Sequence, residues 1–251
     1  MNFNLEIIAF NIDSCSLIEQ AGAHRIELCD NADEGGTTAS YGFIKMAREK
    51  TNIQLFPIIR PRGGDFLYSN DEFVIMQDDI KFCKELQCDG VVTGLLLADG
   101  KIDYERTSRL VQLAYPMEVT FHRAFDRVAD PSVALEEVIK TGCTRILTSG
   151  LFPTAIEGRA GLQLLVKQAD NRIVIMPGSG IRSSNVVEIA QHTGATEFHA
   201  SARTMRPSQM RYQNGQMKED LSEVTVDQHE VGRIMQQLKN HFKNLYETEN
   251  S

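Results

Sequence analysis

A group of arginines, glycines and one aspartate near residue 60 could bind an anion. It consists of Arg60, Pro61, Arg62, Gly63, Gly64 and Asp65. The apolar segment before it is typical of a strand, which must end at the proline because this residue fixes φ and lacks a donor. The arginines offer planar sets of donors that suit carboxylate or phosphate, and the glycines let the backbone turn closely around a ligand. The alternative is a structural turn in which the aspartate pairs with its own arginines.

Two glutamates and two histidines form a second candidate group, with acid–base or metal chemistry. They are Glu6, Glu27, His122 and His199. Carboxylates and imidazoles from different strands could hold a divalent metal ion, or could exchange protons with a substrate. For proton exchange we favour Glu27 and His122, with Glu6 or Asp65 in support, and we assign His199 to substrate binding. The alternative is that both glutamates form buried ion pairs with Arg60 and Arg123.

A glycine-rich turn, Gly178-Ser179-Gly180, follows an apolar segment and precedes a predicted helix. Helix N-termini and glycine backbones provide N–H groups that bind phosphate. We therefore assign this turn, together with Arg60, Arg62 and Arg123, to an anion-binding site. The alternative is a tight turn that needs glycine for its shape alone.

Short apolar segments alternate with helical patterns up to about residue 202, and this alternation predicts a barrel. The expected strands are Leu5–Ala9, Arg25–Cys29, Gln54–Ile59, Gly90–Leu95, Glu118–His122, Arg145–Ser149, Ile173–Met176 and Glu197–Ala200. Eight β–α units in a chain of this length predict a single (β/α)8 barrel of the α/β class, in which the carboxyl ends of the strands meet at one mouth. An open doubly wound sheet is the rival, but no G-x-G-x-x-G turn follows the first strand.

The expected barrel spans residues 1–203, and residues 204–251 add a polar connection and a C-terminal helix to the same domain. The stretch 204–227 is too long for an ordinary connection. It could therefore cover the barrel mouth or contact a partner subunit. We expect a homo-oligomer on this basis, with a dimer favoured.

Composition limits the functional classes. The 251 residues carry a net charge of −8, which argues against binding to nucleic acid or to an anionic membrane surface. No apolar segment is long enough to span a bilayer, and the N-terminus lacks the pattern of a signal peptide. The five cysteines include no C-x-x-C pair, which indicates a reducing cytoplasm. No lysine follows a predicted strand, so Schiff-base chemistry is not expected, and no motif points to an organic cofactor.

Several longer motifs resemble those of the copper homeostasis protein CutC family. They are Arg25-Ile26-Glu27-Leu28-Cys29, Glu34-Gly35-Gly36-Thr37-Thr38, Arg60-Pro61-Arg62-Gly63-Gly64-Asp65-Phe66, Thr120-Phe121-His122-Arg123-Ala124-Phe125-Asp126, Leu147-Thr148-Ser149-Gly150, Met176-Pro177-Gly178-Ser179-Gly180-Ile181 and Gly194-Ala195-Thr196-Glu197-Phe198-His199. They occur in the family's order and with similar spacing, from about Leu5 to Tyr212.

The resemblance implies a TIM-type barrel, a cytoplasmic location, a role in copper homeostasis and binding of Cu(I). Family members proposed to bind copper carry one cysteine on the first strand and one in the R-I-E-L-C motif. Cys29 occupies the second of these positions and Ile8 the first, so Cys29 is the candidate copper ligand. Cys15 lies at the start of the first predicted helix, where the helix N-terminus could lower the pKa of its thiol.

Two functions therefore remain open. The resemblance implies a cytoplasmic copper homeostasis protein that binds Cu(I) through Cys29. The residues at the mouth indicate a barrel enzyme of the lyase or isomerase type, acting on a small anionic or phosphorylated substrate. Copper binding requires Cys29, whereas catalysis requires the arginines and His122.

Overall fold

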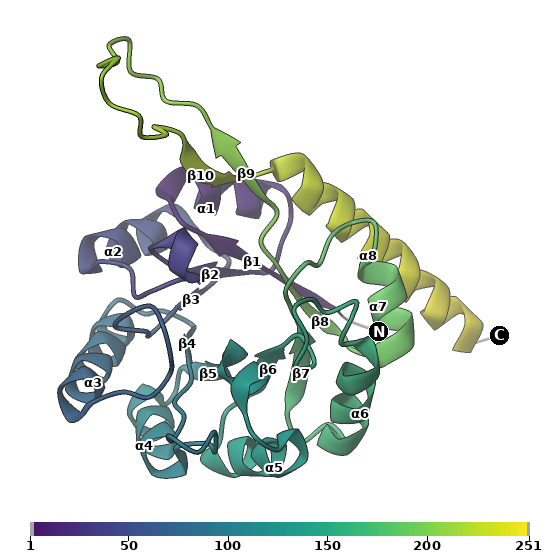
Figure 1. Ribbon diagram of the computed structural model, residues 1–251. Helices are drawn as coiled ribbons and strands as arrows, with labels where there is room; N and C mark the ends of the chain where they lie inside the picture. Colours follow the sequence, from purple (N-terminus) through teal and green to yellow (C-terminus); the bar gives the residue numbers. More distant parts are fainter. Residues whose placement is uncertain (1–2, 250–251) are drawn as a thin grey trace.

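Within residues 3–249, which the computed structural model describes, parallel strands form a barrel and helices cover its outer face (Figure 1). The barrel strands are β1 (Asn4–Ala9), β2 (Arg25–Leu28), β3 (Gln54–Pro57), β4 (Gly90–Thr93), β5 (Glu118–Phe121), β6 (Arg145–Thr148), β7 (Val174–Pro177) and β8 (Glu197–Ala200). The helices around them are α1 (Ile12–Gln20), α2 (Tyr41–Lys50), α3 (Asn70–Glu85), α4 (Tyr104–Ala114), α5 (Pro131–Thr141), α6 (Arg159–Ala169), α7 (Val186–Thr193) and α8 (Gln228–Glu249). Short 3-10 helices, η1 (Ala32–Glu34) and η2 (Arg123–Arg127), follow β2 and β5.

The strands pair in parallel in the order expected of a (β/α)8 barrel. One run of hydrogen-bonded strands is β3-β2-β1-β8 and the other is β4-β5-β6-β7. The runs meet at β3 and β4, where Ile58 bridges to Val92 and the Ile59 N–H donates to the Val92 carbonyl at 2.7 Å. Strand β7 lies beside β8 at the other junction (Figure 1). The barrel prediction is confirmed, and each predicted strand lies within two residues of its observed bounds.

Local sequence signals explain where the helices begin and end. Ser69 and Glu72 form a reciprocal capping box at the start of α3. Asp130 caps α5, and Pro131 occupies the first turn of that helix. Gly142 ends α5 with a φ of 87°, a left-handed conformation that glycine adopts without strain. The helices bury their apolar faces against the strands, and this packing fixes the strand ends that carry the site.

The segment after β8 contains two strands that the sequence analysis did not predict. Strand β9 (Arg203–Arg206) pairs antiparallel with β10 (Glu223–Val226) to form a hairpin that extends outward beside α1 (Figure 1). The Asn11 side chain donates to the Val224 carbonyl at 2.7 Å and anchors β10 to the start of α1. The hairpin projects away from the barrel and does not cover its mouth (Figure 1). None of the helices within residues 3–249 has the length and apolar character needed to cross a bilayer.

Candidate functional site

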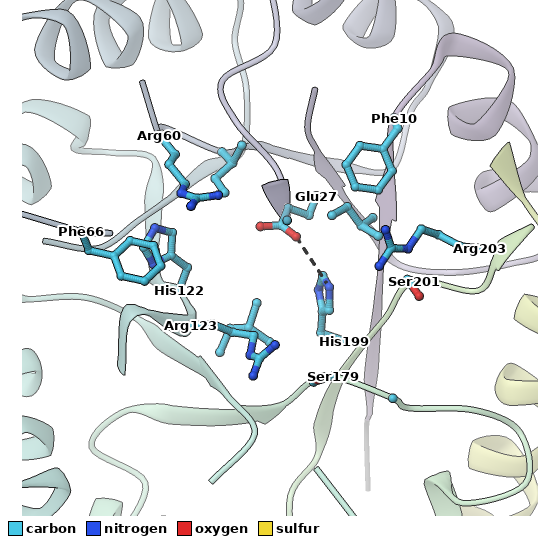
Figure 2. A pocket seen from close by; sticks show the side chains of 15 residues that line it. Phe10, Glu27, Arg60, Phe66, His122, Arg123, Ser179, His199, Ser201 and Arg203 are labelled. Atoms are coloured by element: carbon cyan, nitrogen blue, oxygen red, sulfur yellow. Dashed lines mark ion pairs between the residues drawn. The ribbon is translucent and has the colours of Figure 1, made fainter. Parts of the chain in front are cut away.

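A cavity of about 210 Å³ opens at the carboxyl ends of the barrel strands (Figure 2). Its lining includes most of the candidate residues. Those that the structure brings to the cavity are Glu27, Arg60, His122, Arg123, Ser179, Gly180 and His199. Phe10, Phe66, Ser201 and Arg203 complete much of the wall, from the segments that follow β1, β3 and β8.

Below the cavity, charged side chains fill the barrel interior as a connected network. The Arg25 guanidinium donates to Glu6 at 2.5 Å and to Glu197 at 2.6 Å. Arg145 also donates to Glu197, at 3.1 Å. Burial alone would raise the pKa of Glu6, but Arg25 and His199 lower it to about 2. Glu6 is therefore ionised and forms the buried ion pair, but its partner is Arg25 and not Arg60 or Arg123.

His199 connects this network to the cavity. Its Nδ1 atom lies 2.8 Å from Oε1 of Glu6, and its Nε2 atom lies 3.6 Å from Oε2 of Glu27 (Figure 2). Burial opposes a charge on the imidazole, but the hydrogen bond to Glu6 and the nearby Glu27 raise the pKa of His199. Burial raises the pKa of Glu27 to about 7, and the charge of Glu6 acts in the same direction. A carboxyl group whose pKa is raised to about 7 and an imidazole whose pKa is also raised thus lie side by side.

His122 does not form the predicted acid–base pair with Glu27, because His199 occupies that place. The Nδ1 atom of His122 accepts the Ala124 N–H at 3.2 Å, at the start of η2. Burial lowers the pKa of His122 to about 3, and Arg60 contributes to the shift. The imidazole is neutral at physiological pH, so it cannot act as a cationic acid.

Arg60, Arg123 and Arg203 place their side chains around the cavity (Figure 2). Arg60 is buried and donates to the backbone carbonyls of Glu34, Gly36 and Gly64. Arg123 forms an ion pair with Asp126 at 2.7 Å. Within residues 3–249, Arg203 donates only a long hydrogen bond, 3.3 Å, to a backbone carbonyl.

Arg62 and Asp65 lie outside the cavity, contrary to the prediction. Arg62 donates to Glu72 at 2.5 Å and to Asp65 at 2.9 Å, so its donors are already engaged. The side chain of Asp65 is exposed and points into this local turn. The structural alternative for these two residues therefore holds, while Arg60 turns inward from the same segment.

Only part of the glycine-rich turn after β7 lines the cavity. Ser179 and Gly180 line it, whereas Gly178 packs beneath, where an added Cβ would lie 2.4 Å from Leu147 Cδ1. Ser179 adopts a φ of 75°, and its hydroxyl donates to the Pro153 carbonyl at 2.7 Å. Helix α7 begins at Val186 with Asn185 as its N-cap, so the predicted helix follows the turn after a short connecting segment.

Cys29 is enclosed beside the cavity, in a small apolar cluster with Ile8, Phe56, Ile58 and Val92. An added Cβ on Gly36 would lie 3.0 Å from its Sγ atom, so backbone packs directly on the sulfur. Burial raises the pKa of the Cys29 thiol well above its usual value. The predicted lowering of the Cys15 pKa is wrong, because burial raises it to about 12.

A different group could hold a metal ion. Oxygen or nitrogen atoms of Glu6, Glu27 and His199 all lie within 4.8 Å of one another. Arg25 already neutralises Glu6 in this group, which makes a second positive charge there less favourable.

The sequence analysis missed Arg25, Arg145 and Glu197, although the strand periodicity held a signal for them. Side chains two apart on a strand point to the same side. Arg25 therefore faces the barrel interior with Glu27, and Glu197 faces it with His199. A charged pair repeated at this spacing on two strands could have predicted an ionic barrel interior.

Known proteins resemble this chain over most of its length. Residues 3–204 match the model of the CutC family. A CutC family protein of Chromobacterium violaceum is 54% identical over 211 residues, which cover 84% of this chain and 85% of the relative. The human copper homeostasis protein cutC homolog is 46% identical over 212 residues, 84% of this chain and 78% of the relative.

Solved structures agree with this assignment. CutC of Streptococcus agalactiae matches with a TM-score of 0.75 and 37% identity, covering 79% of this chain and 98% of that one. Thiamine phosphate pyrophosphorylase of Pyrococcus furiosus matches with a TM-score of 0.60 at 15% identity, covering 95% of this chain and 96% of that one, and shares the fold alone. The chain belongs to the CutC family.

Proposed function

We propose that this protein contributes to copper homeostasis, the role in the names of its human and mouse relatives, and that its molecular activity is proton exchange with a small anionic ligand. The observation that carries the molecular part is the Glu27–His199 pair, 3.6 Å apart, on the wall of a cavity that arginines surround. An acid and a base with shifted pKa values that lie together in a pocket are typical of catalytic sites.

The arginines supply the anion-binding part of the proposal. Neither Arg60 nor Arg203 forms an ion pair with a carboxylate in the part of the chain that the structure describes. Their positive charges are therefore not neutralised by a direct ion pair within residues 3–249. Guanidinium groups in a partly enclosed site favour carboxylate or phosphate ligands, and the volume of about 210 Å³ limits the ligand to a small molecule.

Glu27 and His199 supply the proton exchange. With a pKa of about 7, Glu27 is present in both protonation states near neutral pH, which suits a general acid or base. Glu6 holds His199 in place from below and keeps its pKa raised. A barrel enzyme of the lyase or isomerase type would use this pair to move a proton on the ligand.

The residues present do not fit Cu(I) held at Cys29. Cu(I) prefers thiolate or thioether ligands, but this thiol is buried, is held protonated and has Ile8 where a second cysteine would be needed. We therefore propose that the copper role does not depend on a Cys29 copper site. If a divalent metal ion stabilises the protein, Glu6, Glu27 and His199 are the residues to substitute.

A thermal-shift screen of the metal-free protein tests these proposals, because a ligand that binds the folded state raises the midpoint. The screen contains Cu(I), Cu(II), Zn(II), Mn(II), inorganic phosphate, phosphorylated sugars and small carboxylates. Stabilisation by an anion, lost in Arg203→Met but kept in Arg62→Met, supports the pocket. Stabilisation by Cu(I) alone, lost in Cys29→Ser, would contradict it.

Two further expectations belong to this proposal. We place the protein in the cytoplasm, a location supported by five buried cysteines that are all free thiols. We also propose a homodimer formed through the hairpin, which exposes the apolar side chains of Met205, Met210, Tyr212 and Met217.

A further inference from the structure

His122 presents a buried hydrogen-bond donor that no described residue accepts. Its Nδ1 atom accepts the Ala124 N–H at 3.2 Å, so the proton of the neutral ring is on Nε2. The Nε2 atom is buried and has no hydrogen-bond partner within residues 3–249. Buried polar groups are nearly always satisfied, and His122 lines the cavity, so a bound ligand is the natural acceptor.

The imidazole is held in this orientation from both sides. The backbone after β4 lies against it, because an added Cβ on Gly94 would lie 2.5 Å from the His122 Nδ1 atom. The Phe66 ring packs on it with a distance of 4.9 Å between ring centroids. The donor is therefore fixed before any ligand arrives, and preorganised donors are the ones that contribute most to catalysis.

Arg60 lies in the same region. Its three hydrogen bonds to backbone carbonyls use the terminal nitrogens, and its side chain also lies close to the buried Tyr68 hydroxyl. The guanidinium carbon lies 5.2 Å from the centre of the Phe66 ring, the ring that also packs on His122. Burial, together with the positive charge of Arg60, lowers the pKa of His122 to about 3 and keeps the ring neutral.

We propose that the His122 Nε2–H group donates a hydrogen bond to a carbonyl oxygen of the bound ligand, which identifies the ligand class as small anions that carry a carbonyl group. The inference rests on the proposed function and deepens it. Arginines suit the anionic end of such a ligand, whereas a neutral donor suits an oxygen that is uncharged in the ground state and gains charge during reaction.

This assignment also specifies the reaction class. The ionised Glu27 removes a proton from the carbon next to the carbonyl, and the C–H electron pair forms a carbon–carbon double bond. The carbonyl π electrons then move to the oxygen, where the His122 hydrogen bond stabilises the negative charge. When the carbon that lost the proton carries a hydroxyl group, the hydroxyl proton passes to the former carbonyl oxygen, and Glu27 returns its proton to the former carbonyl carbon. The product is an isomer, and no oxidant, reductant or further reactant is required.

Matched ligand pairs that differ only in the carbonyl group test the inference. The pairs are pyruvate with lactate, and dihydroxyacetone phosphate with glycerol 3-phosphate, each titrated calorimetrically. We expect the wild type to prefer the carbonyl member of at least one pair by about tenfold, the contribution of one good hydrogen bond. The preference should vanish in His122→Leu and persist in His122→Gln, whose amide places a donor near the same point. His192→Leu, an exposed histidine on α7, is the control and should behave as the wild type.

The outcomes separate the inference from the proposed function. Equal binding of the alcohol and carbonyl members to the wild type overturns the inference and leaves the anion pocket standing. A preference that survives in His122→Leu also overturns it. If no member of either pair binds, both proposals fail. An independent readout is the ¹⁵N spectrum of His122, which should show the neutral Nε2–H form and should shift when the carbonyl member binds.

Discussion

The Nδ1 atom of His199 lies 2.8 Å from Oε1 of Glu6, a carboxylate that is fully buried in the barrel interior. Because Glu6 is ionised, the imidazole donates this hydrogen bond and turns its other nitrogen toward Glu27. The ionic network inside the barrel thus orients a side chain at the mouth. In this arrangement one residue of the barrel interior, Glu6, influences both titrating groups of the candidate site.

Glu6→Gln should lower the pKa of both His199 and Glu27. The imidazole loses the hydrogen-bonded anion that raises its pKa, and the Glu27 carboxyl loses a neighbouring negative charge that raises its own. The substitution also leaves Arg25 without one of its buried partners, which should lower the free energy of unfolding by about 3–5 kcal/mol. NMR titration and urea denaturation measure the two effects.

The control for this substitution is Glu223→Gln, which breaks an exposed ion pair with Arg206 on the hairpin and should leave stability nearly unchanged. Unaltered titration of His199 in Glu6→Gln would show that the barrel network does not act on the site.

Glu27 should make the protein less stable as the pH rises. Its pKa is about 7 in the folded state and about 4.5 in the unfolded chain. The folded state therefore retains the proton between these pH values while the unfolded state releases it. The contribution of Glu27 to the free energy of unfolding is fully present below about pH 4.5 and is lost as the pH rises through 7. The total change is about 3 kcal/mol.

Comparing the wild type with Glu27→Gln isolates this effect. The comparison is needed because His122 changes the stability with pH in the opposite direction. Its folded pKa is lowered, so its contribution is present above its unfolded pKa and is lost as the pH falls. The difference in unfolding free energy between the wild type and Glu27→Gln should change between pH 4.5 and 7. A constant difference across that range would show that the Glu27 pKa is not raised.

The sequence was sufficient to predict the barrel, but it predicted the candidate site only in part. Alternation of apolar strands and capped helices predicted each strand of the barrel to within two residues, since these signals are local. Which polar side chain meets which depends on how the strands are placed around the barrel. Glu27 therefore pairs with His199 rather than His122, and Arg60 turns inward while Arg62, two residues later, pairs with Glu72. The hairpin strands were missed because they contain few apolar residues and are only four residues long.

The cysteines should be unreactive in the native protein. All five are free and buried, and burial raises the pKa of Cys15, Cys29 and Cys143. A thiol reagent should therefore modify none of them within the time in which it modifies all five in denaturant. Cys29→Ser should bind Cu(I) as the wild type does in competition with a chelator. Rapid modification of one cysteine that Cys29→Ser abolishes would restore Cys29 as a copper ligand.

The hairpin should carry the subunit contact. Replacing residues 208–221 with a short turn removes Met210, Tyr212 and Met217 but keeps the paired strands that pack on α1. Light scattering should then report a monomer in place of the dimer, with an unchanged far-ultraviolet circular dichroism spectrum. The proposal is wrong if the unmodified protein is already a monomer, or if the shortened protein remains a dimer.

Arg203 should contribute to anion affinity without contributing much to the fold. Its only hydrogen bond in the described residues is the 3.3 Å contact to the Ala32 carbonyl, and the guanidinium stacks near Phe10 at the cavity wall. Arg203→Met keeps much of the apolar stem and removes the charge, so phosphate affinity should fall by about tenfold or more while the thermal midpoint changes little.

Arg62→Met is the matched control, since Arg62 is engaged with Glu72 outside the cavity. Calorimetric titration at two salt concentrations should also show a weaker salt dependence for Arg203→Met than for the control, because a charge that faces the ligand has been removed. Equal phosphate affinity in the two variants would place the anion elsewhere in the molecule.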